Sequence, residues 1–188
     1  MNKRLTLVLG GVRAGKSSYA QHLAQRGERV LFVATAEAGD QEMAARIQAH
    51  RENRPAEWRT LEEPLNLVAA LAPLTSYHDT ILLDCLTLWI SNLLLKSRAS
   101  EAAGVDIPAE VRGLLELYRK GTASWIVVSN EVGLGVMPAT ELGRVYADEL
   151  GRTNQTVAAA ADDVYFMAAG LPVDMKATGR DHTAYSVP

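Results

Sequence analysis

Short apolar runs alternate with longer segments of helical periodicity along this chain. Each run is compact, rich in Val, Ile or Leu and largely uninterrupted by polar positions, a pattern that predicts strands buried on both faces of a sheet. The predicted strands are Leu5–Leu9, Val30–Ala34, Thr80–Leu83, Trp125–Ser129 and Val164–Ala168.

The segments between these runs predict helices. They are Lys16–Gln25, Gln41–Arg51, Leu65–Leu71, Leu86–Leu95, Ala109–Tyr118 and Ala139–Ala161. Because strands and helices alternate throughout, we expect an α/β fold with a mostly parallel sheet and helices on both faces. One domain should cover residues 1–176, with surface loops at Ala99–Pro108 and Asn130–Pro138 and a C-terminal tail at 177–188 that has no core pattern.

Composition and charge narrow the possible functions. The 188 residues, 48% hydrophobic and 22% charged, are typical of one globular domain. The 19 Lys and Arg against 22 Asp and Glu give a net charge of −3, which argues against binding to nucleic acid or to an anionic membrane. The apolar stretches are too short for a secretory signal or a membrane span, so we expect a cytoplasmic protein without a stable membrane anchor. Cys85 is the only cysteine, which excludes an intramolecular disulfide framework.

A phosphate-binding motif lies between the first predicted strand and the first predicted helix. The pattern G-x-x-x-x-G-K-[ST] is matched by Gly10, Gly11, Val12, Arg13, Ala14, Gly15, Lys16 and Ser17. Glycines let the backbone approach phosphate oxygens, while the loop amides and the helix N-terminus supply oriented positive ends. In this setting Lys16 reaches the β- and γ-phosphates, and the Ser17 hydroxyl can ligate Mg²⁺. The alternative, a chance glycine turn, requires motif and strand-loop-helix context to coincide by accident.

Two acidic residues follow predicted strands at the expected binding edge of the sheet. Asp84 ends the apolar run that starts at Thr80. It therefore offers a carboxylate at the edge of the sheet where a phosphate-loop site needs an acid on the Mg²⁺ side. Asp is also a favoured helix N-cap, so Asp84 can instead cap the helix that begins at Leu86. Glu131 follows the strand that ends at Ser129, and a solvated loop residue is an equally good interpretation there.

A histidine on the second predicted helix is a candidate nucleophile. Arg46 and His50 are four residues apart and therefore share one helix face. Arg51 and Arg54 follow, and arginines can fork onto phosphate oxygens. A neutral imidazole beside a polyphosphate could attack phosphorus, although an exposed helix histidine with solvated arginines fits the same pattern. The remaining histidines, which we expect at the surface, are His22, His78 and His182.

Several segments together resemble the bifunctional adenosylcobinamide kinase / adenosylcobinamide-phosphate guanylyltransferases of cobalamin synthesis. The resemblance runs from Leu5 to about Lys176. Besides the phosphate loop, the matching segments are Ala34-Thr35, Glu42 to Pro55, Trp58-Arg59-Thr60, Asn130 to Gly135 and Gly151 to Gln155. The spacing Arg-Ile-x-x-His-x-x-x-Arg-Pro and the segment Asn-Glu-Val-Gly-x-Gly are more specific than the phosphate loop. Two departures are Ala14, where a serine is common, and Asp84, where some relatives have Glu.

This resemblance implies a RecA-like P-loop fold, usually assembled as a trimer, and two reactions. The first phosphorylates the aminopropanol hydroxyl of adenosylcobinamide with ATP or GTP. The second transfers GMP from GTP to the resulting phosphate and releases pyrophosphate. The position that becomes guanylylated corresponds to His50, with Lys16 as the other catalytic residue. Mg²⁺ would be held by Ser17 and Asp84. The implied nucleotide contacts are Gly10 to Ser17, Ala34, Thr35, Ala36, His50, Arg51, Glu52, Asn53, Glu62 and Asp84.

Two other functions remain compatible with parts of the sequence. A monofunctional small-molecule P-loop kinase would use His50 and its arginines only to close over the γ-phosphate. A RecA-like nucleotide-dependent module that binds nucleic acid would share the phosphate loop. The net charge of −3 and the absence of a stretch dense in Lys and Arg argue against that module.

Overall fold

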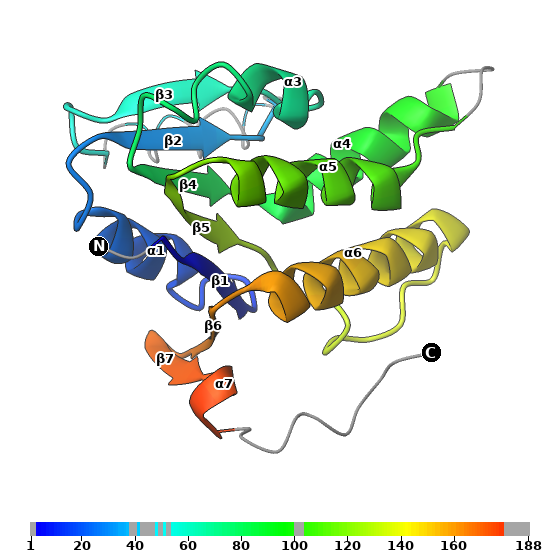
Figure 1. The fold of residues 1–188 in the computed structure, drawn as a ribbon. Coiled ribbons are helices and arrows are strands. Elements are labelled where there is room, and N and C mark those ends of the chain that lie inside the picture. Colours follow the sequence, from blue (N-terminus) through cyan, green and yellow to red (C-terminus); the bar gives the residue numbers. More distant parts are fainter. Residues whose placement is uncertain are drawn as a thin grey trace.

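A single seven-stranded sheet forms the centre of the molecule (Figure 1). The computed structural model describes residues 3–37, 41, 48, 51, 54–99 and 104–178. The strands are β1 (Leu5–Gly10), β2 (Val30–Ala34), β3 (Arg59–Glu62), β4 (Thr80–Asp84), β5 (Ser124–Val128), β6 (Asp163–Ala168) and β7 (Leu171–Asp174). Their order across the sheet is β3-β2-β4-β5-β1-β6-β7.

All neighbouring strands pair in parallel except β6 and β7. This mostly parallel sheet with helices on both faces confirms the predicted fold class. It also brings the carboxyl ends of β1, β2, β4 and β5 to one edge, where ligands of such sheets bind. The strands absent from the prediction, β3 and β7, lie at the two edges of the sheet and are largely exposed. They therefore lack the apolar run by which buried strands are recognised.

The helices are α1 (Lys16–Ala24), α3 (Leu67–Leu71), α4 (Leu86–Ala99), α5 (Ile107–Lys120), α6 (Glu141–Ala160) and the short α7 (Met175–Thr178). The Asp106 side chain caps α5 by accepting a hydrogen bond from the Ala109 N–H, and Thr140 caps α6 in the same way through Gly143. Both α4 and α5 extend beyond the predicted limits into the segment expected to be a loop. The loop predicted at Asn130–Pro138 is present between β5 and α6.

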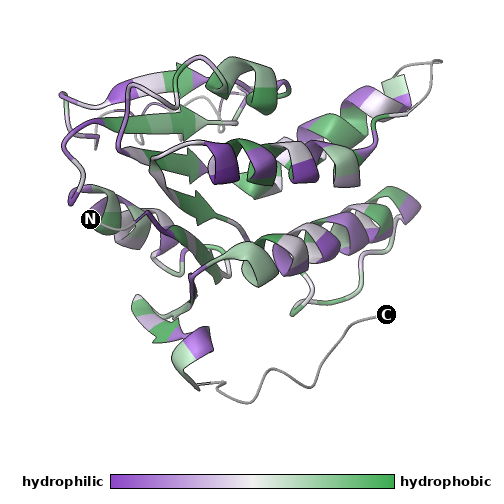
Figure 2. Cartoon of the chain, in the orientation of Figure 1, coloured by the Kyte–Doolittle hydropathy of each residue, from purple (hydrophilic) through white to green (hydrophobic). Residues whose placement is uncertain are grey.

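Alternating strand residues feed two apolar layers. Leu7, Leu31 and Ile81 face a layer that α3, α4, α5 and α6 complete. Val8 and Phe32 belong to the other layer, which receives Ala20 and Ala24 of α1. Helices thus pack on both sides of the sheet, and β2, β4 and β5 are mostly coloured as hydrophobic in Figure 2. Burial on both faces explains why these strands are continuously apolar.

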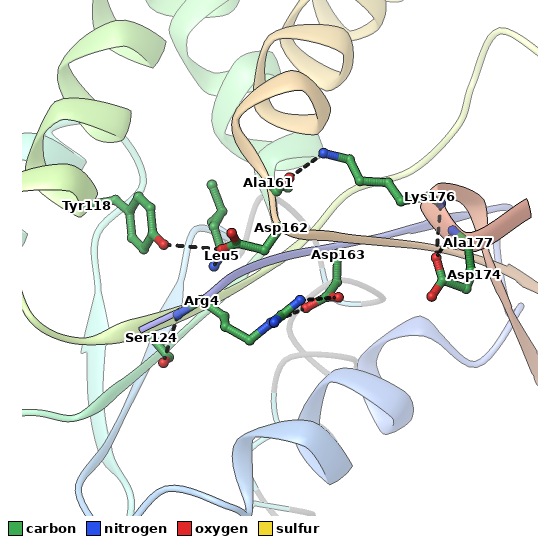
Figure 3. Close-up of polar contacts among 10 residues, drawn as sticks. All are labelled: Arg4, Leu5, Tyr118, Ser124, Ala161, Asp162, Asp163, Asp174, Lys176 and Ala177. Carbon is green, nitrogen blue, oxygen red and sulfur yellow. Dashed lines mark hydrogen bonds and ion pairs between the residues drawn. The ribbon is translucent and has the colours of Figure 1, made fainter. Parts of the chain in front are cut away.

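Polar contacts fasten the amino ends of β1 and β6 to each other (Figure 3). Arg4 forms a two-pronged ion pair with Asp163, with nitrogen-to-oxygen distances of 2.7 and 2.6 Å. The neighbouring Asp162 accepts a hydrogen bond of 2.7 Å from the Leu5 N–H and one of 3.5 Å from the Tyr118 hydroxyl. Lys176 of α7 donates to the Ala161 carbonyl. These contacts lie at the opposite end of the strands from the phosphate loop.

Three sequence expectations need comment. His78 is buried, at 8% exposure, with its Nδ1 2.9 Å from the Leu74 carbonyl oxygen, so its assignment to the surface is wrong. His22 is exposed on α1, as expected, whereas His182 lies outside the described residues. Of the predicted helix Gln41–Arg51, the described residues Gln41, Gln48 and Arg51 are helical. The C-terminal residues 179–188 also lie outside the described part of the chain.

Candidate nucleotide-binding site

The phosphate loop leaves the carboxyl end of β1 and enters α1, as its motif predicts. Gly10 has φ +146° and Gly15 has φ +93°, conformations that residues with a side chain rarely adopt. A Cβ at Gly10 would also lie 2.6 Å from the Met167 carbonyl oxygen. Both glycines are therefore required by the backbone path itself.

Lys16 is the first residue of α1 and is buried, at 9% exposure. Its Nζ donates a hydrogen bond of 2.6 Å to the Gly11 carbonyl, so the ammonium group is held against the loop that precedes it. The α1 N-terminus has no acidic residue in its first turn. An ammonium group and the positive end of a helix thus converge where the motif places phosphate.

The turn between β6 and β7 supports the phosphate loop from behind. The Gly170 N–H donates to the Ala14 carbonyl over 3.1 Å. A Cβ on Gly15 would lie only 3.3 Å from the Gly170 Cα, so the two backbones are in close contact. Sequence reasoning missed this support, because β7 has no strand signal and the contact links positions far apart in the chain.

The carboxyl end of β4 supplies Asp84 to the same edge. The helix α4 starts at Leu86, so Cys85, and not Asp84, is the residue immediately before it. This position weakens the alternative interpretation of Asp84 as the helix cap. Burial, reinforced by the charge of Asp84, raises the pKa of the Cys85 thiol to about 11, against opposing hydrogen bonds from Leu88 and Thr87.

A buried hydrogen-bond chain positions the end of β5. The Ser129 hydroxyl, fully buried, donates to the Asn154 Oδ1 over 2.7 Å, and the Asn154 amide donates to the Asn130 carbonyl over 3.0 Å. The Asn130 N–H in turn donates to the Thr87 hydroxyl over 2.8 Å. This chain explains why two of the specific sequence segments, around Asn130 and Asn154, belong together. Glu131 accepts a hydrogen bond from the Gly133 N–H within its own loop, as a loop residue would.

A pocket of about 770 Å³ lies at this edge of the sheet. The predicted site residues that line it are Val12, Arg13, Ala14, Gly15, Lys16, Ser17, Ala34, Ala36, Arg51, Glu62 and Asp84. Gly10, Gly11 and Thr35 are not among its lining residues, and Thr35 is completely buried. His50, Glu52 and Asn53 lie outside the described residues.

Other lining residues were not predicted as contacts. They are Ser18, Phe32, Gln48, Arg54, Cys85, Leu88, Val128 and Asn130. Most of them look like core or helix positions in the sequence, and only the sheet brings them to the phosphate loop. Of these residues, Arg54 was noted in the sequence as an arginine that can fork onto phosphate oxygens. Arg51, by contrast, forms an ion pair with Glu62 in which its Nε lies 3.0 Å from Oε1.

The donor atoms in the pocket suit a magnesium ion carried in with phosphates. Ser17 and Asp84 both line the pocket and offer oxygen atoms, which Mg²⁺ prefers. Among the described residues, no group of three or more His, Cys, Asp or Glu side chains could hold a metal by itself. Such a site fits an ion that keeps waters and substrate oxygens as its remaining ligands.

Comparison with known proteins decides the family. Residues 6–175 match the CobU model, described as cobinamide kinase / cobinamide phosphate guanyltransferase. The chain belongs to this family. The CobU match covers the described strands and helices apart from Leu5 of β1 and all but the first residue of α7, and it includes the whole phosphate loop.

Members of the CobU family with similar sequences span nearly their full length in the alignment. The chain is 47% identical over 171 residues to the bifunctional adenosylcobalamin biosynthesis protein CobP of Pseudomonas aeruginosa, covering 90% of this chain and 96% of that one. It is 36% identical to CobU of Escherichia coli and 38% identical to CobU of Salmonella typhimurium, each over 180 residues, 92% of this chain and 99% of the relative.

Solved structures with a related arrangement are more distant. The RadB recombinase gives a TM-score of 0.48 at 18% identity over 87% of this chain and 73% of that chain. The P4 protein from bacteriophage phi13 gives 0.43 at 16% identity over 91% and 53%. Neither likeness is close enough to carry an inference about this chain.

No helix in the described part of the chain is long and apolar enough to cross a membrane.

Proposed function

We propose that this member of the CobU family carries out two reactions at its single phosphate-loop pocket. It phosphorylates adenosylcobinamide with ATP or GTP and then transfers GMP from GTP to the product, giving adenosylcobinamide-GDP and pyrophosphate. The observation that carries the proposal is that Lys16, Ser17 and Asp84 line one pocket, in a chain matched by the family model over residues 6–175.

In the kinase reaction the substrate hydroxyl oxygen attacks the γ-phosphorus, the bond from that phosphorus to the nucleoside diphosphate breaks, and the hydroxyl proton is released to water. Catalysis of such a step consists mainly of positioning and of stabilising negative charge. The α1 N-terminus and Lys16 provide positive charge at the phosphates. Mg²⁺, when bound by Ser17 and Asp84, would neutralise further phosphate charge.

In the guanylyl transfer we assign the nucleophile to His50. A neutral imidazole nitrogen attacks the α-phosphorus of GTP, a P–N bond forms, and pyrophosphate leaves. An oxygen of cobinamide phosphate then attacks the same phosphorus and breaks the P–N bond, which restores the imidazole. Gln48 and Arg51, which flank position 50 in the sequence, both line the pocket, and this supports the assignment.

The finer details of the assembly are also proposals. The resemblance favours a homotrimer, the short apolar stretches favour a cytoplasmic protein, and the net charge of −3 favours a protein with no nucleic-acid partner. Sedimentation equilibrium at several protein concentrations would test the trimer. A single species with the mass of one chain would contradict it.

The decisive experiment combines adenosylcobinamide, GTP and Mg²⁺ with the purified protein, followed by mass analysis of the corrinoid. We expect adenosylcobinamide-GDP. A parallel incubation with GTP labelled at the α-phosphate should leave label on the denatured protein. Corrinoid phosphate without further product or protein label would instead identify a monofunctional kinase.

A further inference from the structure

Arg54 occupies an unusual position in the nucleotide pocket. Its Cζ lies 3.7 Å from the centre of the Phe32 ring, so the guanidinium group rests against an aromatic side chain of β2. Phe32 itself is 1% exposed and belongs to the core layer shared with α1. The ring therefore gives Arg54 a fixed support.

Hydrogen bonding at Arg54 is incomplete. Its Nε is buried and has no hydrogen-bond partner among the described residues. Its neighbour Arg51 differs, because that side chain is paired with Glu62. A buried N–H without an acceptor is rare in folded proteins and calls for an explanation. Nε itself has no exposed surface, but Arg54 lines the pocket, so an anion bound there would lie next to its incompletely paired guanidinium group.

The strand order places Arg54 at one end of the pocket. Burial lowers the pKa of its guanidinium, while the carboxylates of Asp84 and Glu62 act in the opposite direction. Asp84 ends β4, and Phe32 lies on β2, on the far side of β4 from the phosphate-loop strand β1. Arg54 thus enters the pocket from the β2 side, and the phosphate loop enters from the β1 side.

This arrangement suggests which phosphate Arg54 contacts. By the chemistry of the motif, the loop amides cradle the α- and β-phosphates and the lysine reaches the β- and γ-phosphates. The phosphate beyond the loop, towards Asp84, is the γ-phosphate. We propose that Arg54, supported by the Phe32 ring, binds the γ-phosphate of the nucleoside triphosphate. The inference rests on the proposed nucleotide site, but it does not depend on the corrinoid substrate.

The test is a comparison of triphosphate and diphosphate binding without corrinoid. Dissociation constants for the β,γ-imido analogues of ATP and GTP, and for ADP and GDP, would be measured by calorimetry in EDTA. A charge-assisted contact to one phosphate corresponds to a change of roughly tenfold or more. Arg54→Gln should therefore weaken binding of the triphosphate analogues at least about tenfold and change diphosphate binding by less than about threefold.

Two further variants separate the charge from its support. Arg54→Lys keeps a positive charge but loses the planar fork, so the triphosphate preference should fall to an intermediate value. Phe32→Leu keeps the core apolar and leaves the guanidinium without its ring, which should also reduce the preference. Arg59→Gln is the matched control, because Arg59 is exposed on β3 and does not line the pocket. Its preference should equal that of the wild type.

The inference is overturned if Arg54→Gln weakens triphosphate and diphosphate binding equally, or neither. If that variant does not fold, as judged by thermal unfolding, Arg54→Lys and Arg54→Met decide the question by the same ratio. Arg54→Gln can lose the triphosphate preference while the wild-type protein makes no corrinoid phosphate. That combination would contradict the proposed function and leave the inference about Arg54 intact. Corrinoid product with an undiminished preference in Arg54→Gln would contradict this inference alone.

Discussion

Thr35 and Cys85 join the carboxyl ends of β2 and β4 by a reciprocal pair of hydrogen bonds. The Thr35 hydroxyl donates to the Cys85 carbonyl over 2.7 Å and accepts from the Cys85 N–H over 3.0 Å. Thr35 is completely buried. The pair fixes the backbone directly after Asp84. Thr35 does not line the pocket, but through this pair it helps to position a residue that does.

Replacing Thr35 by Val should destabilise the protein. The change keeps the shape but leaves the buried Cys85 N–H without its partner, which costs about 1–3 kcal/mol. Urea unfolding measures the loss, and Thr35→Ser, which keeps the hydroxyl, should recover most of it. Thr156→Val is a suitable control, since Thr156 is exposed and bonds only within its own helix. Equal stability of Thr35→Val and wild type would show that the pair contributes nothing.

Lys16→Ala should abolish both reactions. Each uses the same phosphate cradle, and loss of a cation at the reacting phosphates costs roughly a hundredfold or more in rate. The fold should survive, because the hydrogen bond from the Lys16 ammonium group to the Gly11 carbonyl joins residues only five positions apart. Kinase assays and α-labelled GTP incorporation check the two activities separately, with the exposed Lys96→Ala as the control. A folded Lys16→Ala protein with full kinase activity would refute the phosphate-loop assignment.

Asp84→Asn should impair Mg²⁺-dependent turnover more than stability. The substitution preserves the size of the side chain but removes the negative charge on the metal side. A Mg²⁺ titration of kinase activity should shift to higher concentration, with a lower maximum. Asp148→Asn on the exposed surface of α6 should leave the titration unchanged. Unaltered Mg²⁺ dependence in Asp84→Asn would restrict Asp84 to a structural role.

His50→Ala should eliminate guanylyl transfer and the covalent GMP adduct. Kinase activity needs no histidine nucleophile and should persist at least in part. The wild-type adduct should be labile in acid and stable in alkali, as a P–N bond is. Because attack requires a neutral imidazole, adduct formation should also fall as the pH is lowered through the range in which histidine protonates.

His22→Ala is the matched control for this variant, since His22 is exposed on α1. Undiminished adduct on His50→Ala would place the nucleophile elsewhere. A kinase loss as deep as the transfer loss would favour the monofunctional-kinase alternative.

Cys85 should be nearly inert towards iodoacetamide in the native protein. Its pKa is raised from 9.0 to about 11, so at pH 8 the thiolate fraction falls roughly a hundredfold. Alkylation followed by mass spectrometry should be correspondingly slow, and fast in the urea-unfolded protein. Above pH 9 the unfolded thiol loses its proton while the folded one keeps it, so stability should decrease with rising pH. Equal rates in native and unfolded protein would contradict this prediction.

Local pattern was sufficient wherever a segment carries its own physical signal. The five strands predicted from apolar runs are all present, because each is buried on both faces and must be apolar throughout. The phosphate loop was likewise evident from the sequence. Its motif occupies eight consecutive residues, in which the backbone path requires the glycines and the phosphate charge requires Lys16. His50, Glu52 and Asn53 remain predictions of the sequence alone.

Tertiary structure decided what local pattern cannot encode. The edge strands β3 and β7 form through pairing with a neighbour, not through burial, and their polar or short sequences give no warning of it. His78 is buried in the folded chain, although nothing in the sequence around it indicates this. Phe32 and Arg54 reach the pocket only once β2 is placed beside β4. The sequence by itself determined the fold class, the phosphate chemistry and the family, because those depend on contiguous residues. The meeting of distant side chains around the phosphate loop depends on the order of the strands, which only the folded sheet supplies.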